Sequence, residues 1–476
     1  MVLFKLLDRL IGVLSVVLLA RLLTPADFGL VAMAMSLVAM IELMGAFGFD
    51  SALIQRSDAQ RPHFDTAWTF QVIFGLASAV LLLLLAEPAA TFYKDPRIAA
   101  IVPVLAATSV IAGLANIGPV MFRKELDFRR EFRFMLAKRV VGFVATLATA
   151  LLLRNYWALV IGILVGSAAS SAISYAMHPY RPRLSLAARH ELFGFSKWIF
   201  VSSVVAYLQN HADKLILGRI AGPRDLGLYN LAGEVALLPS TAVIAPINRA
   251  VFPAYAALNG ERVALEARFL SVIGTIAALA LPLSLGLGVL AGPAVALLLG
   301  AQWIEAVPLL KLFVLTGLVS ALQGNLYSLI VALGHPQKST LITLWIACVH
   351  VPALALACWY YGVIGAAVAH LVAAVLGLIP LHIVFFRLTR FSVAAYARCF
   401  PRPLMAALAA ALALLGFERL WGADPAASPL LLLIVGSTLF AAIYLALLWA
   451  LWRLAGRPTP CVEAELMQRL QRWVLR

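Results

Sequence analysis

The chain alternates between long apolar segments and short polar connectors along its whole length. The apolar runs have 19 to 28 residues, and a helix that crosses a bilayer needs about 20. Proline and glycine mark several run ends, as in "TPADFG", "KDPR", "AGPRDLG" and "GHPQ". The pattern predicts fourteen membrane-spanning helices, at 4–22, 29–54, 66–86, 98–122, 134–153, 156–177, 195–218, 226–250, 268–291, 306–333, 339–360, 362–386, 402–420 and 430–453.

The composition supports this interpretation. Hydrophobic residues make up 63% of the 476, charged residues 12%, and the mean hydropathy is +0.96. The charged share is about half that of a soluble globular chain, too small to cover the surface of a fold of this size. We therefore expect an all-α polytopic membrane protein of about 14 transmembrane helices.

The basic residues predict how the chain is oriented. With a cytoplasmic N-terminus, and with residues near span ends counted with the adjoining side, 28 of the 37 Lys and Arg residues fall on the cytoplasmic side and 7 outside. The other two, Lys214 and Lys311, lie within spans. This is the positive-inside pattern, so the net charge of +15 does not indicate nucleic-acid binding. Both termini are predicted to be cytoplasmic, and residues 454–476 form an amphipathic tail whose pattern fits an interfacial helix or a solvated tail equally well.

A short connector occurs twice. Residues 21–31 read "RLLTPADFGLV" and residues 219–229 read "RIAGPRDLGLY", an offset of 198. Two weaker echoes keep offsets near 200: 102–116 with 307–325, and 156–162 with 360–366. Three echoes in the same order indicate an internal duplication.

The duplication predicts the domain organisation. The copies start six helices apart, so both enter the membrane in the same direction, as in parallel repeats related by an axis along the membrane normal. We expect an N-terminal lobe at 1–178 and a C-terminal lobe at 195–386, joined by a basic cytoplasmic connector at 179–194. Helices 13 and 14, at 387–453, lie outside the repeat. Lobes of this kind commonly open a shared cavity to alternate sides of the membrane.

Several stretches resemble a known family. They are "ARLLTPADFGLVAMA" (20–34), "SALIQR" (51–56), "NHADKLILGRIAGPRDLGLYNLA" (210–232), "LLPSTAVIAPINRAVFPAY" (237–255) and "QWIEAVPLLKLF" (302–313). They look like the polysaccharide flippases of the multidrug/oligosaccharidyl-lipid/polysaccharide exporter superfamily, in the Wzx-like branch for lipopolysaccharide or exopolysaccharide units. The resemblance runs through about helix 12, and helices 13 and 14 fit it by number.

The resemblance implies a function. Such proteins move undecaprenyl-diphosphate-linked oligosaccharides to the periplasmic leaflet of the bacterial inner membrane. The expected partners are that lipid-linked substrate, membrane lipids and other membrane proteins of polysaccharide assembly, with no nucleic acid. No cofactor or metal is expected, and coupling to H⁺ or Na⁺ is left open.

Ionisable residues within the spans are candidates for the transport chemistry. A charge near the bilayer centre costs about 2.5–3.5 kcal/mol, so such groups should face the protein interior or a wet cavity. Helix 7 holds Asn210, Asp213 and Lys214 at i, i+3 and i+4, with Asp213 and Lys214 pointing roughly 100° apart. They are therefore poorly placed to pair with each other.

A diphosphate headgroup needs cations. Lys214 and Lys311 are the candidates within spans, Arg56 and Arg249 could form a cytoplasmic capture site, and Arg21 and Arg219 could receive the headgroup at the periplasmic side. Structural alternatives exist for each: interfacial anchoring or helix-dipole pairing for Arg21 and Arg219, a topology signal for Arg56 and Arg249, and snorkelling for Lys311.

The carboxylates offer a coupling site. Asp213, Glu42 and Glu234 could bind and release a proton or sodium ion during a cycle, and the alternative is a fixed ion pair with a lysine. His350, His370 and His382 lie singly on apolar helices, so we expect packing residues with satisfied hydrogen bonds.

Two other functions remain alternatives. A cation-coupled multidrug antiporter would use the same scaffold, although the two lysines within spans favour an anionic cargo. A membrane glycosyltransferase or polysaccharide polymerase would need a long periplasmic loop with a catalytic cluster, and the outside loops here are short. We therefore predict a transporter and not an enzyme.

Overall fold

The computed structural model describes residues 2–43, 49–56, 58–189, 191, 204, 207, 211–421 and 428–456. The described residues form helices, turns and connectors, and ten helical stretches are long and apolar enough to cross a membrane. The prediction of an all-helical polytopic membrane fold is confirmed. The chain divides into two compact units, Met1–Asn230 and Leu231–Arg476, which are described separately below.

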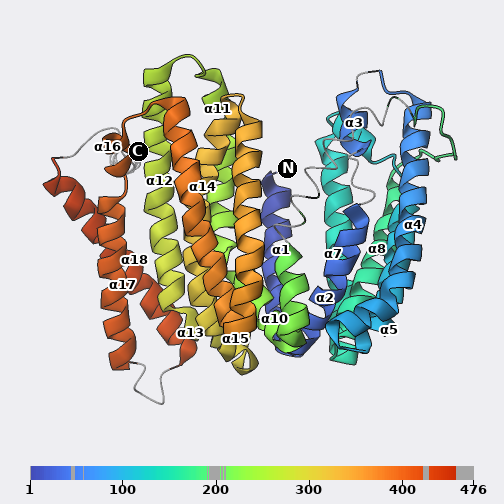
Figure 1. Ribbon diagram of the computed structural model, residues 1–476, viewed down its shortest axis with the longest axis horizontal. Coiled ribbons are helices and arrows are strands. Elements are labelled where there is room, and N and C mark those ends of the chain that lie inside the picture. Colours follow the sequence, from blue (N-terminus) through green and yellow to red (C-terminus); the bar gives the residue numbers. More distant parts are fainter. Residues whose placement is uncertain are drawn as a thin grey trace. The chain divides into compact units, whose positions relative to one another are not determined.

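The first unit contains the predicted helices 1 to 6 and continues into the second copy of the repeat. Its elements are α1 (Val2–Leu22), α2 (Pro25–Glu42), α3 (Phe49–Gln55), α4 (Arg61–Tyr93), α5 (Arg97–Gly113), α6 (Val120–Lys124), α7 (Phe128–Leu153), α8 (Trp157–Met177), a helix at 211–220, and the first part of α10 (Gly222–Ala236). Antiparallel pairs α4–α5 and α7–α8 pack side by side (Figure 1). α5 also packs on α8, and α2 packs on both α4 and α5.

Turn chemistry fixes several helix ends, and three predicted spans differ from the helices observed. The span predicted at 29–54 is covered by two helices, α2 and α3, and the span predicted at 226–250 is divided between α10 and α11. Thr24 and Asp27 form a reciprocal capping box at the start of α2, which satisfies two exposed N–H groups. The predicted span at 98–122 is wrong in its second half, because α5 ends at Gly113. The Asn116 side chain accepts a hydrogen bond from the Gly118 N–H (2.8 Å) and holds a turn there.

The basic connector after α8 is hydrogen-bonded to side chains of α4. The buried Asp65 carboxylate accepts hydrogen bonds from the Tyr180 hydroxyl (2.7 Å) and from the Arg183 N–H (2.9 Å). Thr69 Oγ1 accepts from the Ser185 N–H (2.9 Å), one turn further along α4. This extended segment therefore finds partners for its backbone on side chains of the first unit.

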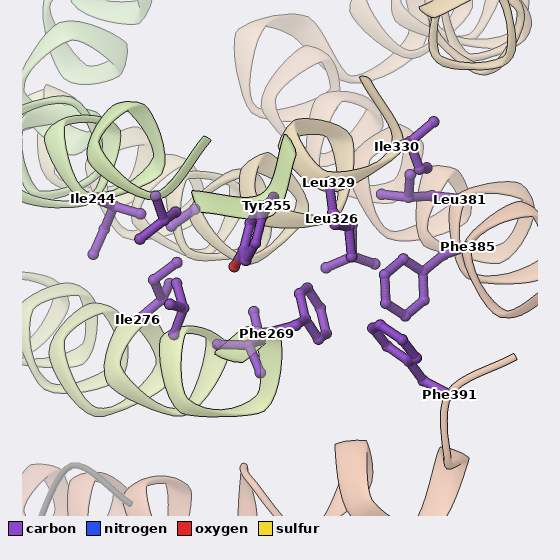
Figure 2. Packing of buried hydrophobic residues seen from close by; sticks show 14 of the residues in the cluster. Ile244, Tyr255, Phe269, Ile276, Leu326, Leu329, Ile330, Leu381, Phe385 and Phe391 are labelled. Carbon is purple, nitrogen blue, oxygen red and sulfur yellow. The ribbon is translucent and has the colours of Figure 1, made fainter. Parts of the chain in front are cut away.

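The second unit holds the remaining helices. They are a π-helical turn at Ser240–Ile244, α11 (Ala245–Ala257), α12 (Arg262–Val289), α13 (Ala291–Leu298), a 3₁₀ turn at Ala301–Ala306, α14 (Val307–Ala332), α15 (Pro336–Thr389), α16 (Val393–Ala397), α17 (Pro401–Trp421) and α18 (Pro429–Leu454). Figure 2 shows the core of this unit, where Phe269, Phe385 and Phe391 meet beside Tyr255. The Phe269 and Phe385 ring centroids are 4.9 Å apart.

Two features of this unit bear on the predicted spans. α15 contains both the 339–360 and the 362–386 spans, and its backbone leaves helical geometry at Gly362 (φ 61°, ψ −152°). A positive φ favours glycine, which lets the chain turn sharply between the two spans. Predicted helices 13 and 14 are α17 and α18, and they share a buried apolar cluster with α12. The C-terminal tail at 457–476 lies outside the described residues.

Candidate functional site

The 211–220 helix carries the central candidates of the first unit. Asp213 and Lys214 are both half-buried, and Asp213 Oδ1 accepts a hydrogen bond from the Lys214 backbone N–H (2.8 Å). Among the described residues, no ion pair joins either side chain to another. Asp213 and Lys214 therefore do not form an ion pair with each other, as their spacing predicts. Asn210 lies outside the described residues.

A buried polar seam joins this region to α2 and α4. Ser36 is fully buried, its Oγ lies 3.0 Å from the Tyr93 hydroxyl, and the Tyr207 hydroxyl donates to the Ser36 carbonyl (3.0 Å). Tyr207 stacks on His211 with ring centroids 5.2 Å apart. Two turns further along, Gly218 lies against Tyr93 and Met33. The start of the second repeat copy is thus held on α2 and α4 within the first unit.

The two copies of the duplicated connector touch each other next to this seam. A Cβ on Gly29 would lie 1.7 Å from the Pro223 carbonyl oxygen, and one on Gly227 would lie 1.8 Å from the Pro25 carbonyl oxygen. Both glycines are buried. Pro25 is equivalent to Pro223, and Gly29 to Gly227, at the offset of 198. The contact is therefore reciprocal: the N-terminal turns of α2 and α10 pack backbone against backbone, and each glycine lies against the proline of the other copy.

The two arginine candidates that were predicted to lie on the periplasmic side differ in environment. Arg21 is exposed in the last turn of α1. Arg219 is half-buried, and its guanidinium lies 5.7 Å from the centre of the Phe92 ring. Its Nη1 is buried without a hydrogen-bond partner among the described residues. Arg219 thus combines an aromatic anchor with a donor that is still free for an acceptor.

Arg56, the candidate predicted to capture the headgroup on the cytoplasmic side, already forms ion pairs. Its guanidinium lies 3.0 Å from the Asp58 carboxylate and 2.5 Å from that of Glu191. Glu191 also lies 3.1 Å from His63 Nε2. The hydrogen bond from His63 and the charge of Arg56 hold the pKa of the Glu191 carboxyl below its usual value. An incoming phosphate would have to displace one of these carboxylates from Arg56.

The other candidates are spread over the helices of the two units. Glu42 lies exposed at the C-terminal end of α2, and Glu234 is exposed on α10. Lys311 is exposed near the start of α14, and Arg249 is exposed on α11.

Asn248, the residue before Arg249, belongs to a buried polar cluster that the sequence analysis did not predict. Asn325 is fully buried, and its Nδ2 donates to Asn248 Oδ1 (3.1 Å) and to the Tyr255 hydroxyl (3.2 Å). Just before α11, the helix widens into the π-helical turn at Ser240–Ile244, a distortion often found at functional sites. Both Asn248 and Asn325 lie within predicted spans, and such polar side chains in apolar segments could have indicated this cluster from the sequence.

Two further contacts were not predicted. Asp8 on α1 pairs with Arg139 on α7 (2.9 Å), a contact between two helices that the sequence pattern does not indicate. The His350 and His370 rings lie 4.6 Å apart, across the turn of α15. His350 Nε2 is buried without a hydrogen-bond partner among the described residues, so the expected hydrogen bond is not made by this nitrogen. That expectation holds for His382, whose two ring nitrogens lie near the Leu378 carbonyl and the Tyr396 hydroxyl.

Comparison with known proteins identifies the family. A model of the polysaccharide biosynthesis protein family matches residues 18–308, more than half of the chain. The chain belongs to this family. The resemblance seen in its motifs is therefore confirmed.

Curated relatives agree with this assignment. The chain is 25% identical over 385 residues to the lipopolysaccharide biosynthesis protein WzxC of Escherichia coli, covering 79% of this chain and 77% of the relative. It is 27% identical over 305 residues to the succinoglycan biosynthesis transport protein ExoT of Rhizobium meliloti, covering 63% and 62%. The teichuronic acid biosynthesis protein TuaB of Bacillus subtilis is 25% identical over 292 residues, with 60% of each chain covered.

Solved structures show the same fold. The lipid II flippase MurJ in an inward closed conformation has a TM-score of 0.79 at 14% identity, covering 96% of this chain and all of MurJ. An inward-facing multidrug resistance transporter of the MATE family, from the MOP superfamily, has a TM-score of 0.62 at 19% identity, covering 81% and 96%. The family and the fold are those of transporters, as predicted, and not of enzymes.

Proposed function

We propose that this protein flips undecaprenyl-diphosphate-linked oligosaccharide repeat units across the bacterial inner membrane by alternating access, for lipopolysaccharide or exopolysaccharide synthesis. Membership of the polysaccharide biosynthesis family and the likeness to WzxC and ExoT support this proposal. In this proposal the predicted lobes at 1–178 and 195–386 move relative to each other during the cycle, and both termini lie in the cytoplasm.

One observation carries the proposal furthest: Asp213 and Lys214 sit half-buried in a helix of the first unit, without an ion pair among the described residues. Each charge within the hydrocarbon region costs about 2.5–3.5 kcal/mol unless water or a partner solvates it. Charges kept there at such a cost indicate a wet, functional surface. A lysine there suits an anionic cargo such as a diphosphate, whose oxygens accept charge-assisted hydrogen bonds.

The remaining candidates suggest a route for the headgroup. Arg249 is exposed and would capture the diphosphate at the cytoplasmic side, whereas Arg56 would first have to release Asp58 or Glu191. Lys214 and Lys311 would hold the headgroup in transit, while the acyl tails stay in lipid. Arg21 and Arg219 would receive it at the periplasmic side, where Arg219 keeps a free donor.

The carboxylates would couple the cycle to an ion gradient. Asp213 lies next to Lys214 in the chain, so a proton or sodium ion on Asp213 would change the net charge that the headgroup meets. Glu42, Glu234 and the amide of Asn210 are the other candidates for this role. Either ion would fit a carboxylate whose charge varies during the cycle.

The decisive experiment is deletion of the gene, with the protein supplied back on a plasmid. We expect the deletion to abolish surface polysaccharide and to leave lipid-linked repeat units facing the cytoplasm, and the plasmid to restore both. Normal polysaccharide in the deletion strain would overturn the proposal. Export of organic cations by the purified protein in vesicles would instead favour the antiporter.

A further inference from the structure

We propose that Arg129 and Arg133 on α7, here called the arginine pair, bind the phosphate of an anionic phospholipid in the cytoplasmic leaflet. The ligand class is a phospholipid with net negative charge, such as phosphatidylglycerol. The proposal uses the predicted orientation of the chain and is independent of the cargo proposed above.

The arginine pair differs from its neighbours because it lacks carboxylate partners. Three nearby arginines form ion pairs: Arg123 with Glu131 (2.7 Å), Arg130 with Asp127 (3.4 Å) and Arg139 with Asp8 (2.9 Å). Arg129 and Arg133 are exposed, and neither forms an ion pair with a residue that the structure describes. Their guanidinium N–H groups are therefore available to a ligand.

The arginine pair shares one face of α7 with exposed apolar side chains. Because an α-helix turns about 100° per residue, Arg129 and Arg133 lie about 40° apart, and Val140, Val144 and Leu151 fall within about 60° of Arg129. These three side chains are 40%, 55% and 54% exposed. An exposed apolar stripe on a membrane-spanning helix indicates contact with acyl chains, since a wet pathway collects polar groups.

The opposite face of α7 is the one that packs within the first unit. A Cβ on Gly162 of α8 would lie 2.8 Å from Thr146 Cα, so the two helices are in close contact there. Phe132 packs edge-on against Phe4 of α1, with ring centroids 6.3 Å apart. The stripe and the arginine pair thus point away from α1 and α8.

The length of the stripe places the arginine pair at the membrane surface. Leu151 follows Arg133 by 18 residues (151 minus 133), which is about 27 Å along the helix. The hydrocarbon core is about 30 Å thick, so the stripe spans the acyl chains and the arginine pair reaches the headgroups. Two guanidiniums one turn apart can donate charge-assisted hydrogen bonds to one phosphate.

The test measures which lipid lies against the stripe. A fluorophore is attached at Val144→Cys, in a full-length chain whose four native cysteines are replaced by serine. The protein is placed in phosphatidylcholine vesicles with increasing amounts of phosphatidylglycerol that carries brominated acyl chains. Bromine quenches on contact, so quenching above that expected from the mole fraction measures the preference for phosphatidylglycerol. Leu84→Cys, at an exposed position on α4, reports the bulk lipid.

The expected preference follows from the two charges. Each basic residue near an anionic surface strengthens binding about fivefold, so we expect a preference of about 25-fold at Val144→Cys. The preference at Leu84→Cys should be close to one. Arg129→Gln or Arg133→Gln should lower the preference at Val144→Cys about fivefold, and the double variant should remove it.

Arg130→Gln is the matched control. Arg130 is also exposed, but it pairs with Asp127 and points about 100° away from Arg129. This variant loses the same net charge and should keep the parent preference. A loss in Arg130→Gln as large as in Arg129→Gln would overturn the proposal, because lipid binding would then follow net charge alone.

The remaining outcomes identify the ligand. An equal preference in the parent and in the two single variants would also overturn the proposal, and these single variants keep the test valid if the double variant fails to accumulate. Unlabelled phosphatidylglycerol should displace the brominated lipid, whereas millimolar inorganic phosphate should not. Displacement by a polyprenyl diphosphate at a far lower mole fraction would overturn the proposal, because the site would then bind the cargo. Polysaccharide export is not measured, so failure of the proposed function would leave the result unchanged.

Discussion

The hydrogen bonds of Asn325 give a sharp prediction about stability. Tyr255→Phe keeps the ring in the aromatic core shown in Figure 2 and removes only the hydroxyl. That hydroxyl and the Asn325 amide are joined by contacts of 3.2 and 3.3 Å, and both residues are fully buried. The variant therefore removes the tyrosine donor from Asn325 Oδ1, while Asn325 Nδ2 loses the hydroxyl as an acceptor and keeps Asn248.

Two ranges of free energy bound the expected loss of stability, one from soluble proteins and one from membrane proteins. A buried group left without its partner costs about 1–3 kcal/mol in soluble proteins. Interhelical hydrogen bonds in membrane proteins average about 0.6 kcal/mol and reach about 1.7. Because the contacts are long and Asn325 keeps its bond to Asn248, we expect about 1 kcal/mol for Tyr255→Phe. Asn325→Leu should cost about 2–3 kcal/mol, since it leaves both partners unpaired.

A double-mutant cycle measures the coupling. The parent, the two single variants and the double variant are unfolded in the same detergent, and Tyr361→Phe serves as the control because Tyr361 is 77% exposed. The double variant should cost about 1 kcal/mol less than the sum of the single variants. Additive costs, or a Tyr255→Phe protein as stable as the control, would refute the reasoning.

Three other predictions concern the fold. Phe269→Ala should lower the free energy of unfolding by about 3–5 kcal/mol, because the ring is fully buried, and equal stability to the parent in the same detergent would contradict this. Thr24→Ala should cost about 1 kcal/mol by removing the cap on the Asp27 N–H, seen as faster hydrogen exchange in the first turn of α2. The hydrogen bond from Arg97 holds the pKa of the Asp95 carboxyl below its usual value. The ionised carboxyl therefore stabilises the fold fully above the unfolded pKa of about 3.9, and this stabilisation is lost as the pH falls through the folded pKa. Asp95→Asn should therefore destabilise the protein at pH 7 and have little effect near pH 3, and an equal effect at both pH values would refute this.

Much of the fold was readable from the sequence because the bilayer sets helix lengths. An apolar run must be about 20 residues long and must satisfy its own backbone, so its position predicts a helix. The start of α2 was predicted at 29, four residues after the observed start at Pro25, although Thr24, Pro25 and Asp27 are typical of a capped N-terminus. The break after Gly113 was not predicted, because the Asn116 turn replaces helix within a continuous apolar run.

The contacts of the site were harder to predict, because they join segments far apart in the sequence. Arg56 and Glu191 pair across 135 positions, and nothing in "SALIQR" indicates this partner. The duplicated connector predicted an internal repeat from local similarity. That its copies would interlock through Gly29 and Gly227 depends on tertiary packing. Asn325 was overlooked, although an amide within an apolar span is itself a signal of a buried polar contact.

The central claim is that a cationic side chain within the membrane holds the headgroup of an anionic lipid-linked cargo. Charge reversal at Lys214 tests this claim most directly, with surface polysaccharide measured per molecule of protein in the membrane. Lys214→Glu should abolish export, Lys214→Arg should retain most of it, and Lys338→Glu, at an exposed position, should match the parent. Full export by Lys214→Glu at normal abundance would contradict the account.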